Sequence, residues 1–218
     1  MSSGTVILGA VLVAGCGQVQ PIVADASAPP SDAAVDGGAA LDGASDALPC
    51  TTYNGTFTTA ELGFASDVGA TAQVDFETRG DGVTGVTAGT PVPIDEYAAC
   101  CGIRIEFVGT DAGGTVIWAG NPQGGFSVRA TCTNGPFCTG TAGVRFTFTT
   151  PVTAVGAEYA GGTTMAVVDA QGTQVAMMSE MGSGTNFLGY ESKVLLTRAQ
   201  LSDSGGEDVA KLLYHHCR

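Results

Sequence analysis

Strict alternation between apolar and polar residues constrains the fold of this chain more than any other feature of its sequence. Ile103, Ile105 and Phe107 are each separated by one charged residue. Successive strand residues point to opposite faces of a sheet, so this pattern predicts a strand with one buried and one solvated face. The same alternation is found at residues 74–76 and 144–148.

Further segments rich in β-branched and aromatic residues predict more strands, separated by glycine-rich turns. Glycine makes up 33 of the 218 residues and charged residues only 13%, a composition poor in strong helix formers. One capping box, Thr58-Thr59-Ala60-Glu61, precedes Leu62, Phe64 and Val68 and predicts one short helix. We therefore expect an all-β fold, a β-sandwich of antiparallel sheets with a short N-terminal helix. The further strands are expected at residues 115–119, 126–131, 154–159, 165–169, 173–178, 187–190, 193–197 and 209–214.

The N-terminus combines a short apolar run at residues 6–14 with a cysteine at position 16. The run is about half as long as a membrane-spanning helix needs to be. It ends in Leu12-Val13-Ala14-Gly15-Cys16, which resembles the bacterial lipobox and implies cleavage before Cys16 and lipidation of that cysteine. Residues 1–15 are then a lipoprotein signal peptide. The usual Lys or Arg before the run is missing, which indicates a misassigned start or inefficient export. The alternatives to a lipobox are an ordinary signal peptide and an untargeted terminus with a chance cysteine.

Residues 16–49 are predicted to be a disordered linker behind the lipidated cysteine. The segment consists largely of Ala, Asp, Ser, Pro and Gly, and its only charges are five aspartates. Such a composition offers no core and favours an extended spacer. The residue after Cys16 is Gly17 rather than the Asp that signals inner-membrane retention in lipoproteins. The resemblance therefore implies an exported protein, lipid-anchored in the outer membrane or at the cell surface of a Gram-negative bacterium.

The charge of the chain argues against a nucleic-acid partner. Its formal net charge is −13, from 21 acidic and eight basic residues. Removing the five linker acids leaves 16 acids against eight bases in residues 50–218, a net charge of −8. The bases are scattered singly, whereas phosphate binding needs clustered Lys and Arg. The expected partner is the membrane, through the lipid.

Six cysteines remain after Cys16, and in an exported domain at residues 50–218 they predict three disulfides. Cys132 and Cys138 enclose a turn sequence, so these two are expected to pair. Cys50 and Cys217 bracket the domain and either join its ends or reach Cys100 or Cys101. The competing interpretation is a metal site made by His215-His216-Cys217 with a distant cysteine.

Several motifs are distributed over residues 56–216. They include Phe57-Thr-Thr-Ala-Glu-Leu-Gly-Phe64, Val74-Asp-Phe-Glu77, Gly102-Ile-Arg-Ile-Glu-Phe107 and Phe146-Thr-Phe-Thr-Thr-Pro-Val-Thr-Ala-Val-Gly156. These motifs resemble the exported β-sandwich domains of bacterial PEP-CTERM proteins. The resemblance implies a jelly-roll-like sandwich and extracellular placement, and no settled activity. The family's Pro-Glu-Pro sorting tail is not found in this sequence, and we expect the lipid on Cys16 to take its place.

No motif in the sequence supports catalysis, so no catalytic residue is assigned. There is no Gly-x-Ser-x-Gly elbow, and the two histidines, His215 and His216, are neighbours that a strand would point to opposite faces. Residues 80–85 fit Gly-x-Gly-x-x-Gly but are not followed by a helix pattern, so no dinucleotide site is expected. The tripeptide Arg79-Gly80-Asp81 is interpreted as a chance match to an integrin-binding motif.

Two ligand hypotheses remain. Jelly rolls of carbohydrate-binding type often hold a structural calcium ion near their first and last strands, which makes Asp75, Glu77, Glu207 and Asp208 candidate ligands; the alternative is solvated acids in turns. Trp118, the only tryptophan, lies beside a Gly/Pro-rich loop and is a candidate for stacking on a sugar, or else a core residue. No other cofactor is expected.

The sequence thus favours a non-catalytic surface lipoprotein that acts in binding or adhesion, with extracellular polysaccharide as the candidate ligand. A structural envelope protein without a ligand is the first alternative, and a buried Trp118 would favour it. A secreted hydrolase is the second, and it would require two carboxylates that converge in a cleft.

Overall fold

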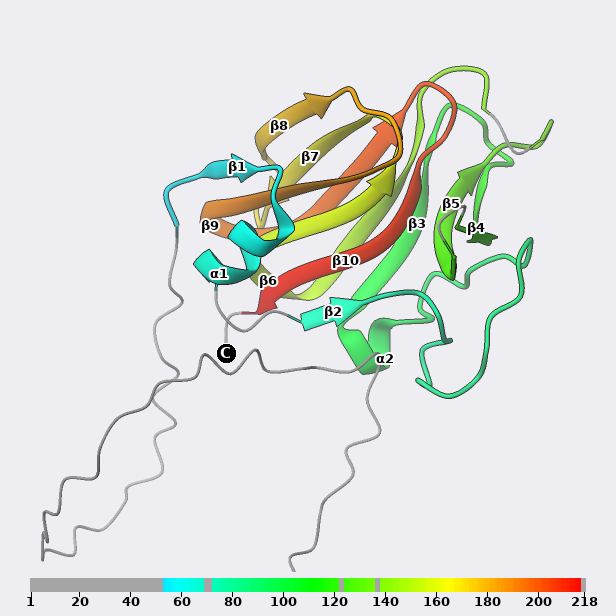
Figure 1. Cartoon of the computed structure of the whole chain (residues 1–218), viewed down its shortest axis with the longest axis horizontal. Helices are drawn as coiled ribbons and strands as arrows, with labels where there is room; N and C mark the ends of the chain where they lie inside the picture. Colours follow the sequence, from blue (N-terminus) through cyan, green and yellow to red (C-terminus); the bar gives the residue numbers. More distant parts are fainter. Residues whose placement is uncertain (1–52, 69–71, 122–123, 136–137, 217–218) are drawn as a thin grey trace, which may run out of the picture.

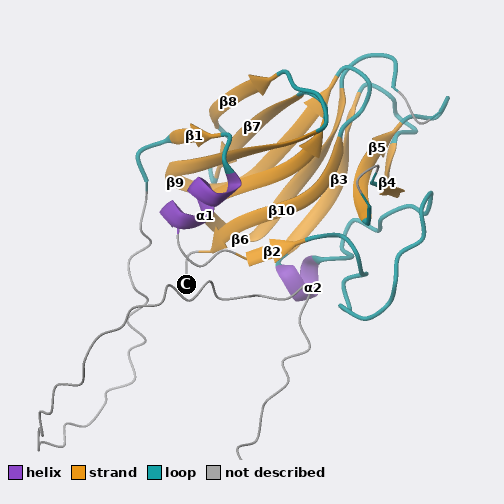
Figure 2. Ribbon diagram, viewed as in Figure 1, coloured by secondary structure: helices purple, strands orange, loops and turns teal. Residues whose placement is uncertain are grey.

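Strands dominate the structure, a computed structural model that describes residues 53–68, 72–121, 124–135 and 138–216 (Figures 1 and 2). The described residues form ten strands and two short helices, and every strand pair is antiparallel. The all-β expectation is confirmed. In chain order the elements are β1 (Thr56–Thr58), α1 (Glu61–Val68), β2 (Ala72–Val74), α2 (Ala98–Cys101), β3 (Ile103–Gly109), β4 (Thr115–Gly120), β5 (Phe126–Thr131), β6 (Ala142–Ala160), β7 (Thr163–Asp169), β8 (Gln174–Glu180), β9 (Thr185–Asp203) and β10 (Asp208–His216).

Two long strands, β6 and β9, give the fold its sandwich-like form. The first half of β6 pairs with β3 and with the second half of β9, which also pairs with β7. The second half of β6 pairs with β10 and with the first half of β9, which also pairs with β1. One layer therefore contains β3, β7 and β8, the other contains β1, β2, β4, β5 and β10, and β6 and β9 belong to both.

The continuity of β6 and β9 corrects the sequence prediction, which divided each of them into two strands. The prediction ended one strand at residue 148 and began the next at residue 154, and Pro151 lies in this gap. In the structure the ladder between β6 and β9 shifts register between Thr147 and Ala154. Proline lacks an N–H to donate, and such an irregularity accommodates it without ending the strand.

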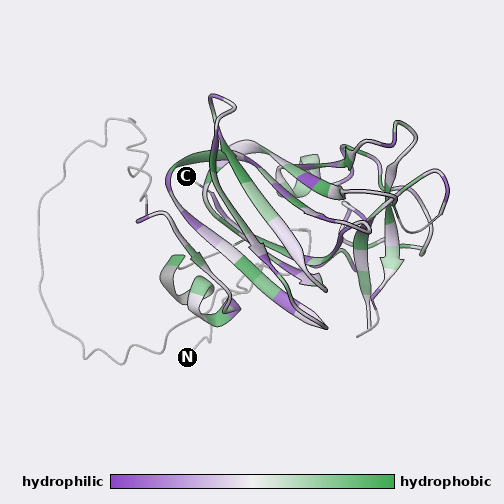
Figure 3. Cartoon of the chain, turned by 90° about the horizontal axis from the view of Figure 1, so that it is seen from above, coloured by the Kyte–Doolittle hydropathy of each residue, from purple (hydrophilic) through white to green (hydrophobic). Residues whose placement is uncertain are grey.

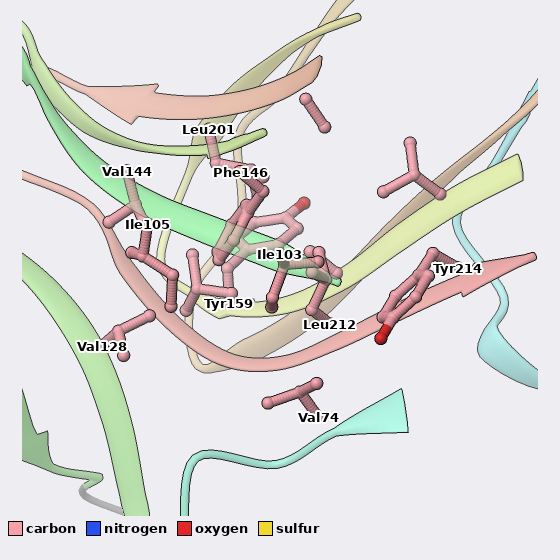
Figure 4. Packing of buried hydrophobic residues seen from close by; sticks show 14 of the residues in the cluster. Val74, Ile103, Ile105, Val128, Val144, Phe146, Tyr159, Leu201, Leu212 and Tyr214 are labelled. Carbon is pink, nitrogen blue, oxygen red and sulfur yellow. The ribbon is translucent and has the colours of Figure 1, made fainter. Parts of the chain in front are cut away.

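The core lies between the two layers. Hydrophobic and hydrophilic residues follow one another along the strands, as the period of two predicts (Figure 3). The inward side chains of both layers join in one buried cluster, which Figure 4 shows from close by. Its members include Ile103, Ile105, Val144, Phe146 and Leu201 from the first layer and Val74, Val128, Tyr159, Leu212 and Tyr214 from the second.

Helix α1 matches the helix predicted from the capping box and packs on the outer face of the second layer. Phe64 and Val68 form a small cluster there with Ala154, Phe187 and Leu213. Gly156 and Gly189 are direct partners in the β6–β9 ladder. A Cβ atom at Gly189 would lie 2.6 Å from the Phe64 ring, so the missing side chain makes room for the helix.

Two short elements were not predicted, the three-residue β1 and the four-residue α2, because both are too short to show a period. Residues 80–85 form turns beside the isolated bridge between Thr78 and Gly85, and the next helix in the chain is α2. The predicted signal peptide, Cys16 and the linker lie outside the described residues.

The structure describes four of the six cysteines that follow Cys16. Cys132 and Cys138 form a disulfide with a Cα–Cα distance of 5.1 Å, as predicted from the turn between them. Cys100 and Cys101 are both disulfide-bonded, and their Sγ atoms lie 2.7 Å apart. Cys50 and Cys217 lie outside the described residues, so the connectivity of the remaining disulfides stays a prediction.

Candidate functional site

A polar groove with a volume of about 360 Å³ opens beside α1. We call it the acidic groove, because three carboxylates line it. It is bounded by the start of α1, the second half of β6, the end of β8 and the start of β9. Its lining residues are Thr59, Glu61, Glu158, Glu180, Thr185, Asn186 and Phe187.

The sheet register positions one side of the acidic groove. Glu158 on β6 lies directly between Lys211 on β10 and Phe187 on β9, so the three side chains form a row across the outer face. Lys211 Nζ lies 2.9 Å from Glu158 and 3.0 Å from Glu61 at the start of α1. One lysine therefore holds two carboxylates of the groove and ties the helix to the sheet.

The opposite side of the acidic groove is fixed by Glu180 and Asn186. The hydroxyl of Tyr159 donates to Glu180 Oε2 at 2.6 Å. Burial and the two neighbouring carboxylates, Glu180 and Glu207, raise the pKa of Tyr159 well above its usual range, so the phenol stays protonated and donates. Asn186 Nδ2 donates to the carbonyl of Gly161 at 2.8 Å, which holds the start of β9 against the β6–β7 turn.

The electrostatics of the acidic groove favour polar ligands. Three carboxylates face a single cation, Lys211, which leaves an excess of two negative charges. Hydroxyl, amide and carboxylate groups line the groove, and Phe187 contributes an apolar surface. This mixture suits a ligand that presents several hydroxyl or cationic donors.

The structure does not bring the four expected calcium ligands into one group. Asp75 accepts a hydrogen bond from the Glu77 N–H at 3.3 Å, and Glu77 accepts one from the Phe126 N–H at 3.0 Å. Asp208 pairs with Arg129 at the start of β10. The described part of the chain contains no cluster of three or more His, Cys, Asp or Glu side chains that could hold a metal ion.

Glu207, the fourth expected calcium ligand, is a buried acid. Only 1% of the residue is exposed, and its carboxylate is bonded to the Thr163 hydroxyl and to the Asp208 N–H. Burial raises the pKa of Glu207 to about 8, against the smaller lowering effect of these two hydrogen bonds. Neutral Glu207 is a poor ligand for a hard cation at neutral pH.

Trp118 is not available as a platform for a sugar, which corrects the ligand hypothesis. The residue is 1% exposed, and its indole N–H donates to the hydroxyl of Tyr97 at 3.2 Å. Tyr97 in turn donates to the carbonyl of Thr78 at 2.7 Å. The guanidinium of Arg79 lies over the indole ring at 5.4 Å. The core alternative is therefore the one that the structure supports.

The Arg79-Gly80-Asp81 tripeptide is engaged within the domain. Arg79 makes two hydrogen bonds with the carboxylate of Glu96. Asp81 accepts hydrogen bonds from the N–H groups of Val83 and Thr84, and so stabilises its own turn. These contacts are consistent with the interpretation as a chance match.

The sequence did not indicate the acidic groove. Its three carboxylates are far apart in the chain, with almost 100 positions between Glu61 and Glu158. The pairing of β6 with β9, the packing of α1 and the hydrogen bond from Tyr159 to Glu180 on β8 bring them together. The one local signal was the capping box, which placed Glu61 at the start of a helix.

The chain was compared with protein families and with curated proteins. No protein-family model matches the chain, and no curated protein matches it significantly. Within the described residues, no helix is long and apolar enough to span a membrane. The fold and the groove define the class, an all-β sandwich-like domain with a polar surface groove.

Proposed function

We propose that the protein is a lipid-anchored surface module that binds extracellular polysaccharide in its acidic groove without catalysis. In this proposal Cys16 carries the lipid and residues 17–49 form the spacer. The observation that carries the proposal is the groove itself. Sugar hydroxyls are donors as well as acceptors, and the rim supplies carboxylate, amide and hydroxyl partners for both roles.

The ion pairs of the acidic groove support a binding role further. Lys211 and Tyr159 hold Glu158 and Glu180 in place, so these carboxylates are already oriented before a ligand arrives. A ligand then loses less free energy in ordering the site. Glu158 remains bound to one cation that it shares with Glu61, which leaves acceptor capacity on both carboxylates.

The proposal is tested by screening the purified full-length protein on a glycan array and titrating the best glycan. Replacement of Glu158 by Gln should weaken binding about tenfold or more, since a hydrogen bond to a charged group contributes roughly 1.5–3 kcal/mol. Lys211 keeps Glu61 as its partner in this variant. The matched control is Glu106→Gln, which changes a half-buried carboxylate on β3 that is bonded to Thr147 away from the groove. If the two variants bind equally well, the groove is not the site.

Two observations favour other functions, and the same screen separates them. The burial of Trp118 favours a structural envelope protein, for which no glycan should bind. The meeting of Glu61, Glu158 and Glu180 in one groove is an arrangement that a hydrolase would need, for which array glycans should be shortened on incubation.

A further inference from the structure

Three of the five methionines of the chain lie within five residues, on β8 and directly after it. They are Met177, Met178 and Met181. Strand β8 is the last in the order of the sheet and pairs only with β7, at the edge of the molecule (Figure 1). The methionines are thus concentrated on an edge strand and the turn that follows it.

These methionines differ sharply in access to solvent. Met181 is 97% exposed and Met177 is 60% exposed, whereas Met178 is partly buried against the core cluster. Met165 on β7, the direct partner of Met178 in the ladder, is 0% exposed. Among the large apolar side chains exposed on the described surface, the thioether sulfur of methionine is the most readily oxidised group.

We infer that Met177 and Met181 form a surface site of methionine oxidation that takes up peroxide without loss of the fold. In each event the thioether sulfur attacks one oxygen of hydrogen peroxide, the S–O bond forms and the O–O bond breaks. The sulfur loses two electrons. The oxygen that is now bound to sulfur gives up its proton, and the departing hydroxide takes up a proton from solvent, so the peroxide is reduced to one water molecule. The product is a sulfoxide, which methionine sulfoxide reductases return to the thioether.

The effect of methionine oxidation on the fold depends on how deeply each methionine is buried. A sulfoxide on Met177 or Met181 stays in water, so the polar oxygen disturbs no apolar contact. A sulfoxide on Met178 would place that oxygen against the core cluster and opposite Met165. The two exposed residues therefore react first and leave the domain folded, and the reaction of Met178 marks the point at which the β7–β8 pairing weakens.

The test is a time course of the full-length protein in hydrogen peroxide, with each sulfoxide located by peptide mass spectrometry. Met181 and Met177 should be oxidised at least tenfold faster than Met165, and Met178 at an intermediate rate. Far-ultraviolet circular dichroism and the melting temperature should stay unchanged while only Met181 and Met177 have reacted. Equal rates at Met165 and Met181, or unfolding during the first two events, would overturn the inference.

Leucine variants provide the control. The double variant Met177→Leu, Met181→Leu should lack the fast phase of peroxide consumption, while Met165→Leu should keep it, because leucine conserves volume without a reactive sulfur. A fast phase that persists in the double variant would contradict the inference even if one of the variants were less stable.

Discussion

Glu207 is a single buried acid whose protonation is coupled to the stability of the fold. Its pKa is about 8 in the folded state, against 4.5 for an ordinary glutamate. Between these two values the unfolded chain releases the proton while the folded chain retains it. The contribution of neutral Glu207 to the free energy of unfolding is therefore fully present below pH 4.5, and it is progressively lost as the pH rises toward 8.

Replacement of Glu207 by Gln should remove this part of the pH dependence. The amide is always neutral, so the variant should be more stable than the wild type at pH 8, by on the order of 2 kcal/mol, and about equally stable at pH 4. Urea unfolding of both proteins at the two pH values measures the difference. A gap that is the same at pH 4 and pH 8 would show that the buried carboxyl is not the titrating group.

At the residue scale, sequence patterns selected residues by their type and position but did not predict which of these side chains would be buried. Glu207 was chosen as a calcium ligand because it lies near the last strand, but its partner Thr163 is 44 positions away and no local pattern marks the contact. Trp118 was weighed as an exposed platform because it is the only tryptophan and lies beside a Gly/Pro-rich loop, whereas the Tyr97 and Arg79 that cover it lie in another loop. Burial of a single side chain is a property of long-range packing.

The docking of α1 depends on the two facing glycines of β6 and β9. Gly189→Ala should destabilise the domain by about 1 to 2 kcal/mol, because the new methyl group would overlap the ring of Phe64. Chemical denaturation measures the change. Gly85→Ala is the matched control, because no atom lies within 4 Å of its added Cβ, and its stability should stay close to that of the wild type.

A double variant tests whether the loss of stability in Gly189→Ala comes from overlap with Phe64. If the loss comes from overlap with Phe64, the combination of Gly189→Ala with Phe64→Ala should be more stable than the sum of the two single losses predicts. Simple additivity would indicate that the alanine acts on the strand alone, and not on the helix above it.

At the element scale, strongly periodic segments were predicted well and irregular ones were not. The alternation at residues 103–107 and the capping box at residues 58–61 corresponded to β3 and α1. The prediction left a gap between residues 148 and 154, whereas pairing on both sides of Pro151 holds β6 together through that point. The acidic groove escaped prediction for the same reason, since it exists only where four separate elements meet.

For the whole molecule, the expectation is a lipidated protein with three disulfides. Mass spectrometry of the unreduced protein, purified from a Gram-negative bacterial host, should show Cys16 as an acylated amino terminus and no free thiol in residues 50–217. Cys16→Ala should abolish the lipid and release the domain from membranes. If Met1 is retained and the cysteines are free, the export interpretation is wrong, and Cys100, Cys101 and His215 to Cys217 become candidates for a metal or redox site.

Strands β6 and β9, which belong to both layers, also determine how the domain responds to force. A pull that travels along the chain from its amino-terminal side enters the described domain at β1, which is hydrogen-bonded to the first half of β9. Because β9 continues into the other layer, and β6 runs beside it through both, tension on one face is passed directly to the opposite face. Because β6 and β9 carry force from either layer into the other, we expect the two layers to resist a pull on the chain together.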